Sequence, residues 1–317
     1  MTSAQKWVQD LKLCHMLEIT PPFLFDKNTL KHLRLPFSFH LMPVFLFALS
    51  QAAAIHWLHT IAAFLILHLL IYPASNGYNS YQDKDETSIG GLKHPPRVTK
   101  NLFYVTLFLD VIGTVLSFFI SVPFAMCVLI YILISRAYSY RKLRLKKYPV
   151  MGFLTVFIFQ GAFTYLMAAI SINKEIDLQT IFSKANILCM TISSFFIGSV
   201  YPLTQIYQHE ADKKDGVVTL SYKLGYTGTF LFSALLFAMA TAILSYYFDE
   251  KHQQFSVLVF FIMMLPVIVR LFYWYHKVYR NSSAANFENT MSMNLLASSC
   301  MNIYFLILTG NNFLAWF

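Results

Sequence analysis

Two short acidic stretches contain the side chains of this sequence that are best suited to chemistry. The first begins at Asn79 and reaches Asp83, directly after the apolar run 57–78. If that run continues as a helix, Asn79 and Asp83 lie one turn apart on the same face. Amide and carboxylate oxygens at this spacing suit a hard cation such as Mg²⁺. Taken alone, the stretch could equally be a polar cap at a membrane surface.

The second acidic stretch comes much later in the chain, at residues 201–216. Helical spacing aligns Tyr201, Gln205, Gln208 and Asp212 on one face. If both stretches leave a membrane on the same side, their oxygen atoms could face each other and hold a metal ion between them.

A basic stretch at residues 138–149 lies between the acidic ones and includes Arg144 and Lys146. Basic side chains beside metal-binding carboxylates indicate a polyanionic ligand. Diphosphate fits this combination, because Mg²⁺ bridges its oxygens to carboxylates while Arg and Lys neutralise the remaining charge. An aromatic-rich helical bundle would accept the apolar tail of such a ligand.

The composition indicates what must position these stretches. The chain has 317 residues, of which 57% are hydrophobic and 12% charged, and its mean hydropathy is +0.53. A soluble domain of this size could not bury so much apolar surface, so we expect a multi-pass membrane protein. Four cysteines without paired spacing argue against a disulfide framework or a zinc site.

Apolar runs long enough to cross a bilayer, about 20 residues each, define the predicted helices. They fall near residues 35–55, 58–78, 101–120, 124–141, 149–171, 186–207, 226–247, 255–275 and 294–316. We therefore expect an all-α bundle of nine transmembrane helices in residues 35–317. Residues 1–34 would form an N-terminal interfacial arm, with Trp7 and Leu11 on the membrane surface, or a simple extension.

Positive charge is distributed asymmetrically along the chain. Of its 24 Lys and Arg residues, 21 lie in the N-terminal arm or near the ends of the even-numbered runs. This bias predicts that the N-terminus and those ends lie in the cytoplasm of a cell-membrane protein. The net charge of +9 is then a topology signal and not a nucleic-acid patch. All three polar stretches fall on the cytoplasmic side.

The three stretches together resemble the motifs of the UbiA family of intramembrane prenyltransferases, over nearly the whole chain. The first family pattern, NDxxDxxxD, corresponds to Asn79, Ser80, Asp83 and Thr87. The second, DxExDxxxG, corresponds to Gln208, Glu210, Asp212 and Gly216. The basic pattern YSxxxxRLKxxP is matched by Tyr138, Ser139, Arg144, Leu145, Lys146 and Pro149. Ser80, Thr87 and Gln208 each stand where the family pattern has an aspartate.

The resemblance implies a helical bundle around a central cavity and an Mg²⁺-dependent transfer of a prenyl chain to a lipophilic, aromatic or quinone-precursor acceptor. In this interpretation Asn79, Asp83 and Asp212 hold the metal, and Asp85, Glu86 and Glu210 are further candidates for it. The prenyl diphosphate donor would be bound by Arg144, Lys146, Lys213, Tyr138 and Gln208.

Two other functions remain open at this point. An intramembrane terpene cyclase of the same fold would let the allylic cation react with its own chain. A membrane transporter would explain Asp110, a carboxylate in the middle of the third run, which is either functional or paired with a polar group such as Arg270. We also expect Pro73 to kink the second helix and the loop containing Gly90 to fold over the site as a lid.

The topology leads to the first testable prediction. Cysteines placed at Lys93, Lys147 and Lys214 should all react with a membrane-impermeant reagent from the cytoplasmic side, because all three belong to positively charged ends. Labelling of intact and inverted vesicles measures this. Reaction of any one of them from outside would contradict both the orientation and the shared site.

Overall fold

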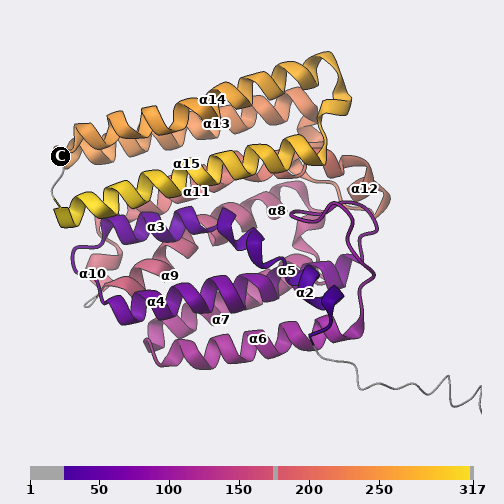
Figure 1. Cartoon of the computed structure of the whole chain (residues 1–317), viewed down its shortest axis with the longest axis horizontal. Helices are drawn as coiled ribbons and strands as arrows, with labels where there is room; N and C mark the ends of the chain where they lie inside the picture. Colours follow the sequence, from indigo (N-terminus) through magenta and orange to yellow (C-terminus); the bar gives the residue numbers. More distant parts are fainter. Residues whose placement is uncertain (1–24, 174–177, 315–317) are drawn as a thin grey trace, which may run out of the picture.

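The computed structural model describes residues 25–173 and 178–314, and this part of the chain forms a bundle of long helices without strands (Figure 1). Residues 1–24, on which most of the predicted interfacial arm falls, lie outside the described residues. Eight described helices are long and apolar enough to span a membrane, and a bent pair makes up to nine. The expected all-α membrane bundle is confirmed, and the count of nine approximately so.

Counted as one span, the bent pair is the first. It consists of α2 (Lys27–Leu33), η1 (Leu35–His40) and α3 (Met42–Gln51), with a bend of 41° at Leu41. Pro36 and Pro43 lie in the first turns of η1 and α3. A proline is tolerated there because its missing N–H would have no partner inside the helix anyway.

The second span, Trp57–Asp83, is continuous. It comprises α4 (Trp57–Leu65), a π-helical turn η2 (Ile66–Ile71) and α5 (Tyr72–Asp83). The π-helical turn ends two residues before Pro73, and the kink expected at this proline stays a prediction. The fifth span, Pro149–Ile172, has the same design, since the π-helical η4 (Phe157–Ala162) separates α8 (Pro149–Val156) from α9 (Phe163–Ile172).

The remaining spans are helices joined mostly by short connections. They are α6 (Lys100–Phe118), α7 (Val122–Ser139), α11 (Lys184–Thr204), α13 (Leu220–Glu250), α14 (Gln254–Arg280) and α15 (Phe287–Leu314). Among them, α13 contains a kink at Gly225, whose φ is 66°. A tight hairpin joins α6 to α7, and Ser121 caps α7 by accepting a hydrogen bond from the Phe124 N–H. Short elements η3 (Leu145–Lys147), α10 (Leu178–Ile181), η5 (Ile206–Gln208), α12 (His209–Lys214) and η6 (Ser282–Ala284) lie in the connections.

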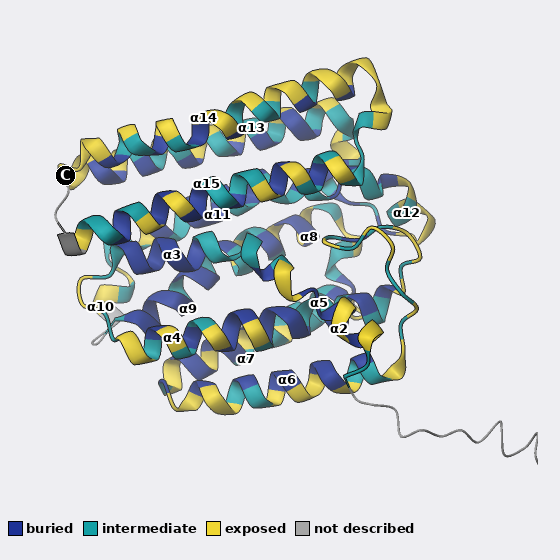
Figure 2. Cartoon of the chain, in the orientation of Figure 1, coloured by how far each residue is buried: buried dark blue, intermediate teal, exposed yellow. Residues whose placement is uncertain are grey.

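The helices are arranged so that the polar stretches meet at one end. Figure 1 shows α2, the loop after α5, α12 and the turn from α14 to α15 at the same end of the bundle, as the charge bias predicts. Figure 2 shows many exposed positions along the outer helices. Large apolar residues are among the exposed ones, for example Leu58, Phe119, Leu133 and Phe272. That surface suits a protein whose helices face lipid.

The buried carboxylate of Asp110 on α6 is paired with Arg136 on α7. The Arg136 Nε donates to Asp110 Oδ2 at 3.0 Å, a second guanidinium nitrogen donates to the Thr106 carbonyl at 3.3 Å, and the guanidinium lies 3.9 Å from the centre of the Tyr78 ring. The prediction that Asp110 is paired with a polar group is therefore correct, but the partner is Arg136. Arg270 instead donates to Asn289 at 3.0 Å.

This pair gives a stability prediction. Arg136→Leu should lower the free energy of unfolding by about 3–5 kcal/mol, because it leaves a carboxylate buried without a partner. Adding Asp110→Leu should recover much of the loss. Thermal unfolding in detergent measures both, and Arg280→Leu, at an exposed arginine, is the control. A double variant no more stable than Arg136→Leu would show that the unpaired charge is not the cause.

Candidate active site

The candidate site is built on the last turn of α5, where Asn79 and Asp83 lie at the polar end of the bundle. Asp83 is the last helical residue, and its side chain is buried. The helix ends because Lys84 adopts a left-handed conformation, with φ of 55°. The sequence-based placement of both residues on one helical face is consistent with the contacts they share.

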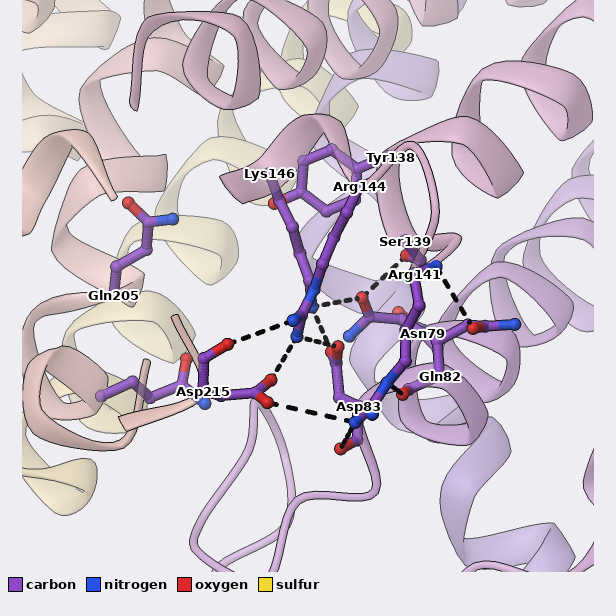
Figure 3. Close-up of polar contacts among 12 residues, drawn as sticks. Asn79, Gln82, Asp83, Tyr138, Ser139, Arg141, Arg144, Lys146, Gln205 and Asp215 are labelled. Carbon is purple, nitrogen blue, oxygen red and sulfur yellow. Dashed lines mark hydrogen bonds and ion pairs between the residues drawn. The ribbon is translucent and has the colours of Figure 1, made fainter. Parts of the chain in front are cut away.

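Two basic side chains from the link between α7 and α8 converge on these residues (Figure 3). The Arg144 Nη2 lies 3.1 Å from Asp83 Oδ1, and the Lys146 ammonium forms an ion pair with the other carboxylate oxygen. Lys146 also donates to Asn79 Oδ1 at 3.2 Å, and the Ser139 hydroxyl donates to the same oxygen at 2.8 Å. The basic stretch and the first acidic stretch therefore form one network.

The second acidic stretch joins this network through Asp215, just after α12. Arg144 forms an ion pair with the Asp215 carboxylate and donates to its carbonyl at 3.3 Å. Arg141 donates to the Gln82 carbonyl at 2.7 Å and to the Asp83 carbonyl at 3.2 Å. From the sequence, Asp215 had no assigned role, and Arg141 was counted only among the basic residues that indicate the orientation of the chain in the membrane. The signal for Asp215 was its place three residues after Asp212, inside the family motif.

Two further carboxylates, Asp85 and Asp212, belong to the same electrostatic environment. Burial raises the pKa of Asp85 to about 6, helped by the negative charge of Asp83 and opposed by Lys146 and Arg34. Asp212 interacts electrostatically with Lys146, Asp85 and Asp83. Carboxylates from both acidic stretches therefore gather at one place, where their repulsion favours bound cations.

Other predicted site residues lie at different distances from this network. Glu86 and Glu210 are exposed, and Lys213 is exposed with its ammonium 5.6 Å from the centre of the Tyr222 ring. Gln208 donates to the Ser88 carbonyl at 3.1 Å and so connects the two acidic stretches. The Tyr138 hydroxyl lies 2.5 Å from the hydroxyl of Tyr201, a pairing that places it beside the second stretch.

The oxygen atoms of this site fit an Mg²⁺ ion that also binds a phosphate ligand. Among the residues that the structure describes, no group of three or more His, Cys, Asp or Glu side chains forms a metal site. Mg²⁺, however, is commonly bound by one or two carboxylates together with water and substrate phosphates. Asn79, Asp83 and Asp212 can supply such oxygens, so the site fits a metal bound jointly with a phosphate ligand.

The loop after α5, residues 84–99, is tied to three other elements at this end of the bundle. Arg34 donates to the Gly90 carbonyl at 3.1 Å and to the Asn76 carbonyl at 2.9 Å. Gln208 holds Ser88, and Lys93 forms an ion pair with Glu288 of α15 at 2.5 Å. These contacts fit the expected lid, and they give Arg34 a role that its count as topology charge did not indicate.

Behind the network lies a largely apolar cavity of about 260 Å³ between α3, α5, α11, α13, α14 and α15. Asn76, one turn before Asn79, and Tyr201, the partner of Tyr138, are among its lining residues. The cavity therefore begins next to the charged network. Aromatic rings, among them Phe37, Phe196 and Phe237, form part of its wall.

Comparisons with known proteins bear on the family and the fold. Residues 40–296 match the model of the UbiA prenyltransferase family. A solved UbiA homolog from Archaeoglobus fulgidus, bound to GPP and Mg²⁺, is 16% identical, with a TM-score of 0.62 over 90% of this chain and 100% of that one. The same homolog bound to DMAPP and Mg²⁺ is 15% identical, with a TM-score of 0.63 over 90% of this chain and 99% of that one.

A third solved structure, of digeranylgeranylglyceryl phosphate synthase, is 17% identical to this chain, with a TM-score of 0.57 over 90% of this chain and 98% of that one. At these identities the structural matches show the shared fold. No curated protein matches the chain.

Proposed function

The chain belongs to the UbiA prenyltransferase family, and from this premise we propose that it transfers an isoprenoid chain from a prenyl diphosphate to a lipophilic acceptor within the membrane. The observation that supports this most is the charged network of Asp83, Arg144 and Lys146 close to an apolar cavity, which is lined by the neighbouring Asn76 and Tyr201. A ligand with an anionic head and an apolar tail matches both parts at once. The site would face the cytoplasm.

The diphosphate head would be bound by exchange of ion-pair partners. Arg144 and Lys146 engage the carboxylate of Asp83, and Arg144 also engages Asp215. Diphosphate oxygens are strong acceptors for the same guanidinium and ammonium groups. When these cations turn to the diphosphate, the Asp83 carboxylate would become available to a metal ion, and Arg141, 4.0 Å from the Asp215 carboxylate, would remain beside that group.

Asn79, Asp83 and Asp212 would hold Mg²⁺, and solved structures of the A. fulgidus UbiA homolog with GPP or DMAPP also contain this ion. When bound, the ion neutralises charge that develops on the leaving diphosphate. Arg144 and Lys146 contribute to the same end from the protein side. The carboxylate of Asp85, which is partly buried nearby, would balance part of the positive charge of the metal ion and the basic side chains.

The chain's own residues explain how the reactive carbon would be protected. The bond between the allylic carbon and the diphosphate oxygen breaks, and the electron pair leaves with the diphosphate. The resulting cation lies next to the aromatic rings Phe37, Phe196 and Phe237, which can stabilise it, in a cavity that excludes most water. The acceptor then forms the new bond to that carbon and loses a proton.

The two carboxylates that belong to different motifs give the main test. Asp83→Asn and Asp212→Asn should each lower Mg²⁺-dependent release of pyrophosphate from a prenyl diphosphate by about 100-fold or more, since a bound metal ion contributes several kcal/mol. Because both residues would serve one metal site, the double variant should lose little beyond either single one. Release is measured with purified protein, with and without Mg²⁺.

Glu210→Gln is the matched control, since Glu210 is an exposed carboxylate on the same short helix as Asp212. It should remain close to wild type. Full activity of both aspartate variants would contradict the proposal. Mass spectrometry of the lipid products separates the alternatives, because a terpene cyclase yields a hydrocarbon or alcohol from the donor alone and a transporter yields no product.

The basic link gives a second prediction. Lys146→Ala should weaken binding of a prenyl diphosphate by about 1.5–3 kcal/mol, the range for hydrogen bonds to charged groups. Lys147→Ala, which removes an exposed lysine from the same turn, should leave affinity unchanged. Titration of the purified variants measures both. Equal affinities for Lys146→Ala, Arg144→Ala and wild type would remove this link from the site.

A further inference from the structure

A second cavity, of about 360 Å³, lies at the end of the bundle opposite to the charged network. Its walls come from the end of α3 and the link that follows, from the turn between α13 and α14, and from the last turns of α15. Figure 1 shows these elements at one end, away from α12 and the loop after α5. This distal cavity is lined mostly by polar side chains, among them Gln51, Gln253 and Asn312. The proposed transfer of a prenyl chain uses none of them.

Lys251 is the only charged side chain among the described residues that line the distal cavity. Its ammonium lies 4.6 Å from the centre of the Tyr247 ring and donates to Gln51 Oε1 at 3.4 Å, and it forms no ion pair with a described residue. Gln51 Oε1 also accepts a hydrogen bond from the Tyr247 hydroxyl at 2.7 Å. An ammonium group has three N–H donors, so Lys251 retains donors for a ligand.

The carboxylates next to Lys251 are engaged elsewhere. Glu250 forms an ion pair with Lys184, and Asp249 accepts a hydrogen bond from the Gln254 side chain at 3.1 Å. Neither carboxylate lines the cavity. The described lining residues therefore leave a positive charge in the cavity without a negative partner, which favours an anionic ligand.

Two further donors point to an anion with several oxygen atoms. The side chains of Gln253 and Ser256 line the cavity and have no hydrogen-bond partner among the described residues, and Ser256 is only 3% exposed. His252, with φ of 56°, reverses the chain between α13 and α14, so that Lys251 and Gln253 border the same space. Gln253 is the N-cap residue of α14, but its side chain does not cap the helix. The positive end of the helix dipole therefore adds to the attraction for an anion.

We propose that the distal cavity binds the phosphate group of an anionic membrane phospholipid, with Lys251, Gln253 and Ser256 as its donors. Phosphate oxygens are strong acceptors for an ammonium group and can accept from an amide and a hydroxyl at the same time. The ends of membrane spans lie at the depth of the lipid headgroups, so a phospholipid reaches the cavity from its own leaflet. This binding is independent of the proposed function, because it involves the opposite end of the bundle.

An exposed apolar stripe on α14 favours a lipid over a free phosphate ion. The stripe consists of Leu258, Ile262 and Leu265, each more than half exposed, and it begins two residues after Ser256. Spacings of four and three residues place the three side chains on one face of the helix. Acyl chains pack along such a face, whereas a free ion gains nothing from it.

The charge of the cavity also favours an anionic headgroup over a zwitterionic one. A choline or ethanolamine headgroup brings a second cation next to Lys251, and no carboxylate among the described lining residues is present to compensate it. The glycerol of phosphatidylglycerol is uncharged and leaves the phosphate as the partner of the lysine. We therefore expect this cavity to distinguish lipids by the net charge of their headgroup.

Three lipids with identical acyl chains test the proposal. The full chain in detergent, freed of native lipid, is titrated with phosphatidylglycerol, phosphatidylcholine or diacylglycerol, and native mass spectrometry measures the bound lipid. Wild type should bind phosphatidylglycerol about 10-fold more tightly than either other lipid, which corresponds to about 1.4 kcal/mol. Equal binding of phosphatidylglycerol and phosphatidylcholine, or of phosphatidylglycerol and diacylglycerol, would overturn the proposal.

Variants then locate the preference. Lys251→Gln should reduce it to about 2-fold or less, whereas Lys251→Arg, which keeps the charge, should retain most of it. Ser256→Ala should weaken binding of phosphatidylglycerol by about 3-fold, as expected for one hydrogen bond. Thermal unfolding without lipid shows that each variant is folded, and Gln253→Ala, at an exposed residue, replaces any variant that is not.

Lys277→Gln is the matched control, since it removes one positive charge from an exposed lysine near the other end of α14. It should keep the full preference. An equal loss in Lys277→Gln and Lys251→Gln would show that the preference reflects general surface charge and would overturn the assignment. A full preference in Lys251→Gln would do the same.

Inorganic phosphate distinguishes the two sources of the ligand. Millimolar phosphate should leave binding of phosphatidylglycerol to wild type unchanged, because the free ion lacks the acyl chains that pack on α14. Displacement of the lipid by phosphate would show that the cavity is a site for a free anion and would overturn the assignment to a phospholipid.

Discussion

The need to compensate charge inside a low-dielectric bundle is the constraint on which this structure depends. Asp83 is buried at the end of α5, and its carboxylate is stabilised by Arg144 and Lys146 from another connection. Arg144 in turn brings in Asp215 from beyond α12. Because an isolated buried charge is very unfavourable, these contacts fix the relative positions of three segments that are far apart in the sequence.

Much of the fold could be predicted because membrane insertion imposes simple rules. A run of about 20 apolar residues is sufficient to indicate a span, and eight of the described helices satisfy it directly. The first span is the exception. It is divided by prolines and a 41° bend, and only the structure shows that the bend carries His40 into the cavity. The π-helical turns were also not readable, since they shift a helix by one residue without any distinct composition.

The candidate site was predictable in part for a different reason. Motif spacing indicated Asn79, Asp83, Arg144 and Lys146, and the structure brings them into contact. Pairing of charges was not predictable, because several basic residues were equally plausible partners for each acid. Asp110 pairs with Arg136 and not with Arg270. Exposure likewise separates Glu86 and Glu210 from Asp85 although all are acidic residues of the motifs.

The exchange of partners that we propose for Asp83 would have a thermodynamic consequence. Freeing its carboxylate for a metal ion breaks contacts with Arg144 and Lys146, and an anion that binds those two cations removes that cost in advance. The two ligands should therefore enhance each other's affinity by the same factor, as reciprocity of linked equilibria requires. A site with this property binds either ligand weakly when it is alone and binds both more tightly when they are present together. Occupancy of the site would then depend on the product of the two ligand concentrations and not on each one separately.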